Sequence, residues 1–426
     1  MAHGWLAKLE CPRCCYRPEV KDAANYLGCP RCRAEIGIPV NYLAMSAPAT
    51  GEKFDKALAR DPNLGIWRWE SLLPVHSEAP ITLGEGNTPL IRLDGVGKRS
   101  KAGSLYLKNE ASNPTWTHKD RLSAAAVTAA SVLGASAVVA ASTGNHGASI
   151  AAYAARGNMR CIISTYTWAP ETMRTLMEVY GAEVHGFERS EQRYEMIAVG
   201  AAESGWYPCS NSTWPPVGSP PYGVDGYKTI AYELWEQLPN QSIDAVVVPT
   251  GYGDCIRGIA RGFDDLREAG VVDYSPKLIA AEVFGKISRS LRSSSNDLGP
   301  ESVHPTTAFS ISNECTTYQA LDAVRSNGGR AVSVSEEDIL GAQVDLARLD
   351  GLYVEASSAV AVAAVQQAFR SGILHHDDTV VLVSTSSGLK DPGTTAEFLA
   401  QRKRRSDVGA SDATPSQSDG IQRADV

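Results

Sequence analysis

Short apolar, β-branched runs alternate with longer stretches of helical periodicity along most of this 426-residue chain. The short runs predict strands at Leu105–Lys108, Ala137–Ala141, Arg160–Ser164, Ala245–Val248, Leu278–Val283, Val332–Val334 and Thr379–Val383. The longer stretches predict helices at Asp120–Val132, Ala148–Arg156, Glu171–Tyr180, Ile256–Leu266, Glu336–Leu349 and Ala359–Phe369. Ser335 is placed to cap the fifth of these helices. Such an alternation indicates an α/β fold with a parallel sheet.

Three stretches interrupt the alternation. Residues 43–80 are mixed and polar, and we expect Trp67 and Trp69 to anchor them by packing. Residues 208–223 are rich in Pro, Ser and Gly and predict a long loop. After a basic patch at 402–405 the chain is rich in Ser, Asp and Gly, so we predict that residues 401–426 form a disordered tail.

The most apolar stretch, residues 122–141, consists mainly of Ala, Val, Ser and Thr and contains Gly134. Membrane spans use larger apolar residues without a turn, so we predict a buried helix, a turn at Gly134 and a strand. The first residues show no secretory signal. The formal net charge of −8 argues against a nucleic-acid partner. We therefore expect a cytoplasmic protein without a membrane or nucleic-acid partner.

Five of the nine cysteines fall within the first 32 residues. Cys11 and Cys14 form one CxxC pair, Cys29 and Cys32 form a second, and fourteen residues separate the pairs. Two such turns can bring four thiolates together on one zinc ion. We predict a structural zinc site on these four residues, in a zinc-ribbon-like knuckle at residues 1–42, and leave Cys15 out of it.

Three segments carry the candidate chemistry. Lys119 lies at the predicted start of a helix, within Thr117-His118-Lys119-Asp120-Arg121. Two glycine-rich loops, 142–147 and 251–255, each follow a strand and precede a helix, so that their amides can face an anion. An amine can form an imine with an aldehyde, while the loops can hold a phosphate and a carboxylate. The set fits an aldehyde cofactor that carries a phosphate.

Seven motifs occur in an order that resembles one family. They are Gly84–Leu90, Lys108–Glu110, Thr117–Arg121, Ser142–Gly147, Pro249–Gly253, Glu355–Ala359 and Gly388–Pro392. Together they resemble the fold-type II pyridoxal-phosphate (PLP) enzymes, the tryptophan-synthase-β-like group, over about residues 83–392. Within that group the Gly-Leu-Lys-Asp-Pro ending and the cysteine knuckle are typical of the threonine synthase branch.

The resemblance implies two α/β domains, built on parallel and mixed sheets, with the cofactor in the cleft between them. We predict a large PLP-binding domain at residues 80–125 and 235–395 and a small domain at 126–234. Members of the family are often dimers, so by resemblance alone we expect a homodimer.

The resemblance also implies the cofactor-binding residues. Lys119 matches the lysine that holds the cofactor as an imine, and its amine can afterwards remove the Cα proton of an amino acid. Asn145 matches the residue that contacts the ring hydroxyl, and Thr385 matches the hydroxyl partner of the ring nitrogen. A hydroxyl cannot keep that nitrogen protonated, which favours elimination and replacement over transamination. Gly251 and Gly253 match the phosphate cradle, where glycine allows close backbone approach.

The chain departs from the family pattern at Asp254, where a glycine is common. We expect the amides of Asp254 and Cys255 to bind the phosphate beside those of the two glycines, with the Asp254 side chain facing outward. By resemblance, Ser142, Thr143 and the neighbouring Gly144 amide hold the substrate carboxylate. That list also includes Lys228, from a Gly-x-Lys-Thr motif near the site.

The substrate stays open at this stage. Threonine synthases commonly bind the phosphate of phosphohomoserine with an arginine shortly before the Gly-x-Lys-Thr motif, and residues 220–226 contain none. Arg174 or Lys228 could replace it. The first interpretation is a threonine synthase acting on a small amino acid. The second is a related PLP lyase, a β-eliminating ammonia-lyase or a β-replacement enzyme for a serine-like substrate. The third is a binding scaffold that has lost catalysis, against which the intact lysine and loops argue.

Overall fold

The larger of two main sheets contains six strands in the order β13-β12-β11-β14-β6-β5. In this computed structural model, which describes residues 4–293, 297–300 and 302–411 (405–411 by backbone alone), all neighbours in the sheet are parallel except β5 and β6. The strands are β5 (Leu90–Arg92), β6 (Ser104–Asn109), β11 (Ala245–Pro249), β12 (Lys277–Glu282), β13 (Arg330–Ser333) and β14 (Thr379–Ser384).

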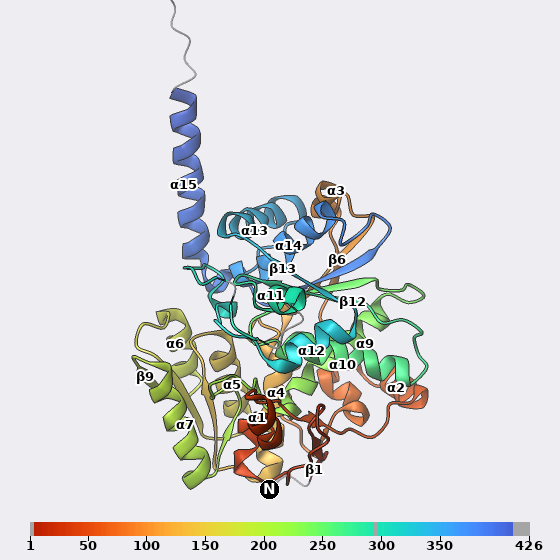
Figure 1. The fold of residues 1–426 in the computed structure, drawn as a ribbon, viewed down its shortest axis with the longest axis vertical. Helices are drawn as coiled ribbons and strands as arrows, with labels where there is room; N and C mark the ends of the chain where they lie inside the picture. Colours follow the sequence, from red (N-terminus) through yellow and green to blue (C-terminus); the bar gives the residue numbers. More distant parts are fainter. Residues whose placement is uncertain (1–3, 294–296, 301, 412–426) are drawn as a thin grey trace, which may run out of the picture. The chain divides into compact units, whose positions relative to one another are not determined.

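Helices cover both faces of this sheet (Figure 1). One face packs against α3 (Asp94–Ser100), α13 (Glu336–Asp350) and α14 (Ala356–Arg370). The other packs against a layer with α9 (Lys228–Gln237), α10 (Asp254–Glu268) and α12 (Tyr318–Ser326). Along β11, Ala245 and Val247 belong to the first core, whereas Val246 and Val248 belong to the second. A strand that is buried on both faces reads as a continuous apolar run, as this one does.

The smaller sheet is fully parallel, with the order β10-β7-β8-β9. Its strands are β7 (Ala137–Ala141), β8 (Cys161–Tyr166), β9 (Glu183–Phe187) and β10 (Trp206–Pro208), connected by α5 (Asn145–Arg156), α6 (Glu171–Val179) and α7 (Ser190–Ser204). They are preceded by α4 (Lys119–Leu133). The strands of the larger sheet lie in the segments that we assigned to the large domain, and those of the smaller sheet lie in the segment of the small domain. The domain boundaries themselves stay a prediction.

The first 77 residues add two short antiparallel pairs, β1 (Gly4–Leu6) with β4 (Val75–Ser77) and β2 (Leu9–Glu10) with β3 (Leu43–Ala44). They also contain η1 (Ala23–Leu27), α1 (Pro30–Ile36), α2 (Gly51–Leu58) and η2 (Pro62–Leu72). Trp67 and Trp69 are buried, as the sequence predicts. The remaining short helices are η3 (Glu110–Ser112), α8 (Pro221–Val224), η4 (Asp225–Tyr227), α11 (Lys286–Ser293), η5 (Phe309–Ile311) and η6 (Gly388–Lys390).

The predicted fold class and every predicted strand and helix are present, with ends displaced by a few residues. Gly134 ends α4 with a φ of 73°, and the Ser335 hydroxyl accepts a hydrogen bond from the Asp338 amide at the start of α13. Elements that the sequence did not predict, such as β9 and α7, have weak patterns. The strand β9 is largely exposed and contains glycine, so alternation and β-propensity are both weak there.

The tail prediction needs a correction. Residues 391–426 form a second unit, in which α15 (Pro392–Ser411) continues through the first part of the predicted disordered tail. The cause is local, because residues 396–405 are mostly good helix formers such as Ala, Glu, Leu, Gln, Lys and Arg. The rest of the predicted tail, 412–426, lies outside the described residues.

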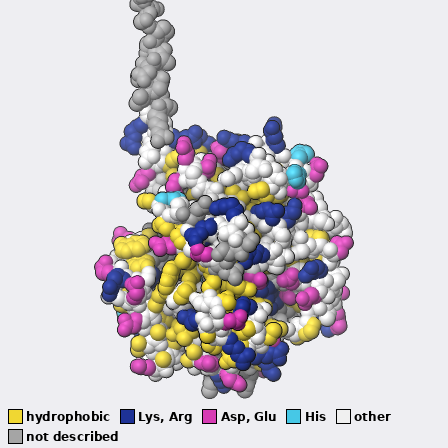
Figure 2. Space-filling view, viewed as in Figure 1, with side chains coloured by type: hydrophobic (Ala, Val, Ile, Leu, Met, Phe, Trp, Pro, Cys, Tyr) yellow, Lys and Arg dark blue, Asp and Glu magenta, His cyan; other side chains and the backbone are white. Residues whose placement is uncertain are grey.

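Acidic and basic side chains are mixed over the face drawn in Figure 2, which carries no continuous basic surface. Within the described ranges, no helix is both long and apolar enough to cross a membrane.

Glu85 is a buried carboxyl group that ties the segment before β5 to the helices of the smaller sheet. Its Oε2 accepts hydrogen bonds from the Tyr153 hydroxyl of α5 at 2.8 Å and from the Thr82 hydroxyl and Leu83 amide at 3.0 Å. Its Oε1 is buried without a partner in the described part of the chain. Burial raises the pKa of Glu85 from 4.5 to about 7.

We predict that Glu85→Gln removes a pH dependence of stability. Because its folded-state pKa is raised, Glu85 binds a proton more tightly in the folded chain, so its stability contribution is complete below pH 4.5 and is lost as pH rises through about 7. The variant should match the wild type at pH 4.5 and exceed it above pH 7 by up to about 3 kcal/mol. Urea unfolding at both pH values, followed by circular dichroism, measures this difference. An equal difference at both pH values would contradict it.

Candidate active site

The carboxyl ends of neighbouring strands place the two residues before Lys119 against Thr385. Ser384, the last residue of β14, pairs with Asn109, the last residue of β6, and an isolated bridge joins Thr117 to Ser386. The Thr385 carbonyl accepts three hydrogen bonds at 3.0 Å, from the Thr117 hydroxyl and from the amide and Nδ1 of His118. These contacts join the segment before α4 to the loop after β14.

Lys119 is the first residue of α4, and buried ion pairs fix the turn that follows it. The Arg121 guanidinium lies 2.7 Å from the Glu110 carboxylate and 2.6 Å from Glu233, and all three side chains are buried. The Asp120 carboxylate accepts a hydrogen bond of 2.6 Å from the Thr115 amide. The contacts of Asp120 and Arg121 therefore hold the start of the helix.

The Lys119 amine has the environment that an imine-forming amine needs. Burial lowers its pKa below 10.5, opposed in part by Asp254 and Cys255. The amine lies 6.0 Å from the centre of the Tyr227 ring. His118 stacks on the same ring at 5.4 Å, and burial holds the pKa of His118 well below 6.5. A neutral His118 adds no positive charge of its own beside the amine.

The loop between β7 and α5 is shaped by Ser142. The Ser142 hydroxyl accepts hydrogen bonds from the amides of Gly147 at 2.9 Å and Gly144 at 3.2 Å. It is therefore committed to the turn, whereas the half-buried Thr143 hydroxyl has no hydrogen bond among the described residues. His146 donates from Nε2 to the Cys209 carbonyl at 2.9 Å, and burial lowers its pKa to about 3, which favours a packing role over a proton relay.

Asn145 meets two residues that the sequence analysis did not assign to the site. Its Nδ2 donates to the Glu355 carboxylate at 2.7 Å, and its Oδ1 accepts from the Lys390 amine at 2.7 Å. Burial lowers the pKa of Lys390 to about 8. Glu355 and Lys390 belong to two of the seven motifs, so the signal was present. What the sequence could not give was their meeting at Asn145, 210 and 245 positions away.

The glycines after β11 are required by close packing. A Cβ on Gly251 would lie 2.4 Å from Asn313 Oδ1, and one on Gly253, whose φ is 88°, would lie 2.1 Å from the Cβ of Ala320. Gly253 precedes α10, and the first amides of a helix, here those of Asp254 and Cys255, have no acceptor within the helix. They can bind an anion, as predicted. Cys255 is buried and packs in the larger core.

The predicted outward orientation of Asp254 is wrong. Its side chain is buried, and it accepts hydrogen bonds from the Ser219 hydroxyl at 2.7 Å and from the Ser219 amide at 3.2 Å. These two donors stabilise the buried carboxylate and join the start of α10 to the loop before α8.

Thr385 follows the last residue of β14, and its hydroxyl contacts Ser358. Its Oγ1 lies 2.8 Å from the Ser358 hydroxyl, which also accepts the amides of Thr385 at 3.0 Å and Ser386 at 2.8 Å. Ser358, like Glu355 and Lys390, belongs to one of the seven motifs but received no role in the sequence analysis. Its contacts leave little freedom to the Thr385 side chain.

Lys228 does not belong with the other candidate substrate residues. Its amine is buried and lies 2.6 Å from Asp265 and 3.0 Å from the Leu72 carbonyl. Arg174, the other candidate for a phosphate clamp, is about half exposed and pairs with Glu178 at 3.8 Å. In the stretch where the family has an arginine, a Cβ on Gly223 would lie 3.1 Å from side-chain atoms of α4, which leaves no room for a long side chain.

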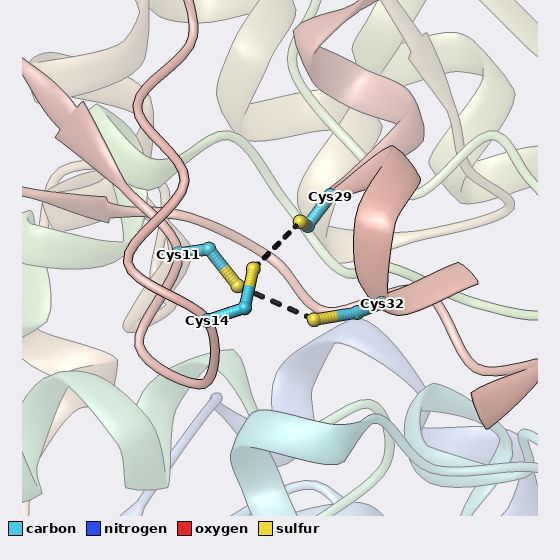
Figure 3. Close-up of side chains that lie close together, drawn as sticks. All are labelled: Cys11, Cys14, Cys29 and Cys32. Carbon is cyan, nitrogen blue, oxygen red and sulfur yellow. Dashed lines mark hydrogen bonds between the residues drawn. The ribbon is translucent and has the colours of Figure 1, made fainter. Parts of the chain in front are cut away.

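The four predicted cysteines converge (Figure 3). Their sulfur atoms all lie within 4.8 Å of one another, with Cys11 and Cys32 at 3.6 Å and Cys14 and Cys29 at 3.4 Å. Four thiolates at 2.3 Å around a tetrahedral zinc would be about 3.8 Å apart, so the cluster fits that ion. Cys15 is exposed and lies outside the cluster.

The residues around Lys119 fit a PLP cofactor on three counts. They offer a half-buried amine with a lowered pKa, a glycine loop that a Cβ would obstruct at two positions, and a hydroxyl just after β14. The amide group of Asn145, in the loop motif 142–147, accepts a hydrogen bond from Lys390 of the last motif, Gly388–Pro392.

Comparison with known proteins agrees with this geometry. The family described as pyridoxal-phosphate dependent enzyme matches residues 81–386. Threonine synthase of Methanocaldococcus jannaschii is 35% identical over 354 residues, which cover 80% of this chain and 84% of the relative. Threonine synthase of Methanosarcina acetivorans is 31% identical over 383 residues, covering 88% and 90%.

Solved structures share the fold at lower identity. Maize serine racemase has a TM-score of 0.64 at 19% identity, covering 84% of this chain and 99% of the racemase. The processed form of threonine deaminase isoform 2 from Solanum lycopersicum has a TM-score of 0.61 at 19% identity, covering 81% and 88%. With a family match over most of its length and relatives above 30% identity, the chain belongs to the pyridoxal-phosphate-dependent enzymes, in their threonine synthase branch.

Proposed function

We propose that the protein converts O-phosphohomoserine into threonine and inorganic phosphate. The observation that carries the proposal is the half-buried Lys119 amine at the start of α4. It lies within electrostatic reach of Asp254 and Cys255 in the phosphate-type loop, and the two residues before it bind the Thr385 carbonyl. The similarity to two threonine synthases over at least 80% of the chain supports this choice of reaction.

The residues divide the work. PLP supplies an aldehyde and a ring that withdraws electrons from the bound amino acid. Lys119 holds the cofactor and then moves the proton at Cα, because its lowered pKa leaves more of the amine neutral at working pH. The amides of Gly253, Asp254 and Cys255 bind the cofactor phosphate at the start of α10.

The substrate carboxylate binds at the loop between β7 and α5. We assign it to the Thr143 hydroxyl and the first amides of α5, with Ser142 and Gly144 shaping the turn. Asn145 faces the cofactor ring, and Lys390 orients its amide, because an ammonium group only donates and must face Oδ1. Thr385 meets the ring nitrogen with a hydroxyl, which suits elimination followed by water addition.

The test is turnover by the purified holoenzyme with four amino acids, O-phosphohomoserine, serine, threonine and O-phosphoserine. We expect phosphate and threonine in equal amounts from O-phosphohomoserine, together with a shift of the cofactor absorbance band. The products are measured by chromatography and a phosphate assay. Turnover of serine or O-phosphoserine alone would contradict the proposal and favour the related ammonia-lyase or β-replacement enzyme.

Two variants control this experiment. Lys119→Ala should lower kcat by at least about 10³-fold, because it removes both the cofactor attachment and the base. Lys98→Ala changes an exposed lysine of α3 and should leave kcat unchanged. A protein without any cofactor band after incubation with PLP would argue for a binding scaffold.

We also propose that Cys11, Cys14, Cys29 and Cys32 bind a structural zinc ion. A polar connection supports a role of this ion at the active site. Asn41, at the end of the knuckle, donates to the Ser219 carbonyl at 2.8 Å, and Ser219 in turn binds Asp254 at the start of α10. The knuckle thereby braces the loop that holds the cofactor phosphate.

Zinc removal is therefore expected to weaken cofactor binding. We predict that the variant Cys11→Ser with Cys32→Ser contains less than one-tenth of the wild-type zinc and has a raised Kd for PLP, measured by elemental analysis and fluorescence titration. Cys15→Ser, at the exposed neighbour, should change neither value. One zinc per chain in the double variant, or its absence from the wild type, would refute the assignment.

The remaining expectations complete the proposal. We propose that the enzyme is a homodimer, which the family resemblance supports. We also propose that it is cytoplasmic, because its cysteines are free and mostly scattered, as is usual in a reducing compartment. We keep the large domain at 80–125 and 235–395 and the small domain at 126–234 as proposed boundaries.

A further inference from the structure

The proposed substrate carries a phosphate on its side chain, but the usual arginine for this group is missing. Gly223 occupies the corresponding stretch against α4. Lys228 is neutralised by Asp265, and Arg174 is half exposed beside Glu178. A phosphate dianion needs at least one cation near it, so another residue must supply the charge.

Arg193, in the first turn of α7, has the required form. Its side chain is 94% buried, since the residue is 6% exposed, and its Nε donates to the Ser164 carbonyl at 3.2 Å. Its Cζ lies 4.1 Å from the centre of the Tyr166 ring, which in turn stacks on Trp168 at 4.6 Å. This stack covers a face of the guanidinium and leaves the edge donors Nη1 and Nη2 to bind.

The position of Arg193 lies between the two loops of the active site. The Ser164 carbonyl that it contacts also accepts the Ser142 amide at 3.0 Å, at the start of the carboxylate loop. On the other side, Tyr252 belongs to the phosphate-type loop and interacts with Tyr194, the residue after Arg193. Burial raises the pKa of Tyr252, and the charge of Arg193 opposes that rise, which places the guanidinium within electrostatic reach of this loop.

The charge of Arg193 lacks a counter-ion. Across residues 4–293, 297–300 and 302–404, the hydrogen bond from Nε to the Ser164 carbonyl is the only one that this side chain donates, and no ion pair includes it. Most of this side chain is desolvated, and its Nη1 and Nη2 are not among the buried atoms without a partner, so the guanidinium edge stays open to solvent. A largely desolvated charge without a counter-ion favours binding of an anion at that edge. The arrangement calls for an anion that arrives from solution.

We infer that Arg193 binds the phosphate on the side chain of the substrate, in place of the missing family arginine. This inference rests on the proposed function, because it assumes that the amino group of the same substrate is held at Lys119. The carboxylate loop and Tyr252 would then lie on either side of the bound phosphate. Arg193 thereby selects amino acids that end in an anionic group over neutral ones.

The experiment compares Arg193→Gln, Arg193→Lys and the matched control Arg174→Gln as holoenzymes. Arg193→Gln should raise KM for O-phosphohomoserine at least about 30-fold and raise the inhibition constant of inorganic phosphate similarly. Arg193→Lys keeps the charge without the two-pronged donor and should lie between. Arg174→Gln should match the wild type. The cofactor absorbance band should stay unchanged in all three variants, which shows that the site is still assembled.

The outcomes separate this inference from the proposed function. Unchanged KM and phosphate inhibition in Arg193→Gln, with normal wild-type turnover, would overturn the inference alone. If the wild type does not turn over O-phosphohomoserine, the proposed function fails. The role of Arg193 is then tested by measuring ligand binding instead of turnover. The band shift is then titrated with O-phosphoserine and with serine. A preference for O-phosphoserine that disappears in Arg193→Gln supports the inference, and no preference overturns it.

Discussion

The geometry of the active site depends on the buried ion pairs of Arg121 with Glu110 and Glu233. Glu110 follows β6, Arg121 lies in the first turn of α4, and Glu233 lies in α9, so the cluster joins three elements at one point. Lys108 adds a second cation 2.6 Å from Glu233. Removing one partner from such a cluster leaves a buried charge uncompensated, at a cost of about 3–5 kcal/mol.

The position of Lys119 follows from this constraint. Arg121, two residues after Lys119, is held by its ion pair with Glu110, and the two residues before Lys119 bind the Thr385 carbonyl. The backbone on both sides of Lys119 is therefore fixed, which restricts the direction of its side chain. The site thus consists of a rigid lysine and of loops that are braced from outside. Ser142 and Ser358 close two of the loops with hydroxyl groups, and Ser219 holds the third through Asp254. Hydroxyl side chains suit this task because each both donates and accepts.

The sequence alone predicts the fold well, because buried parallel strands read as continuous apolar runs and their helices have caps and glycine stops. It also predicts which residues are candidates for binding the cofactor. Lys119, Gly251 and Gly253 belong to motifs whose order along the chain matches that of the family. It could not predict the orientation of side chains that depend on distant partners. Asp254 faces Ser219 and Lys228 faces Asp265, and both pairs are set by how separate elements pack. The helix at 392–411 was not predicted, because its helix formers at 396–405 precede a Ser-, Asp- and Gly-rich stretch that dominates the composition of the tail.

The assignment of Lys119 as the residue that holds the cofactor can be tested without any substrate. Borohydride reduction of the holoenzyme fixes the cofactor to the amine that carries it, and digestion followed by mass spectrometry identifies the modified peptide. We expect the added mass of the reduced cofactor on Lys119 alone. Modification at Lys390, the buried amine that contacts Asn145, with Lys119 unmodified, would contradict this assignment.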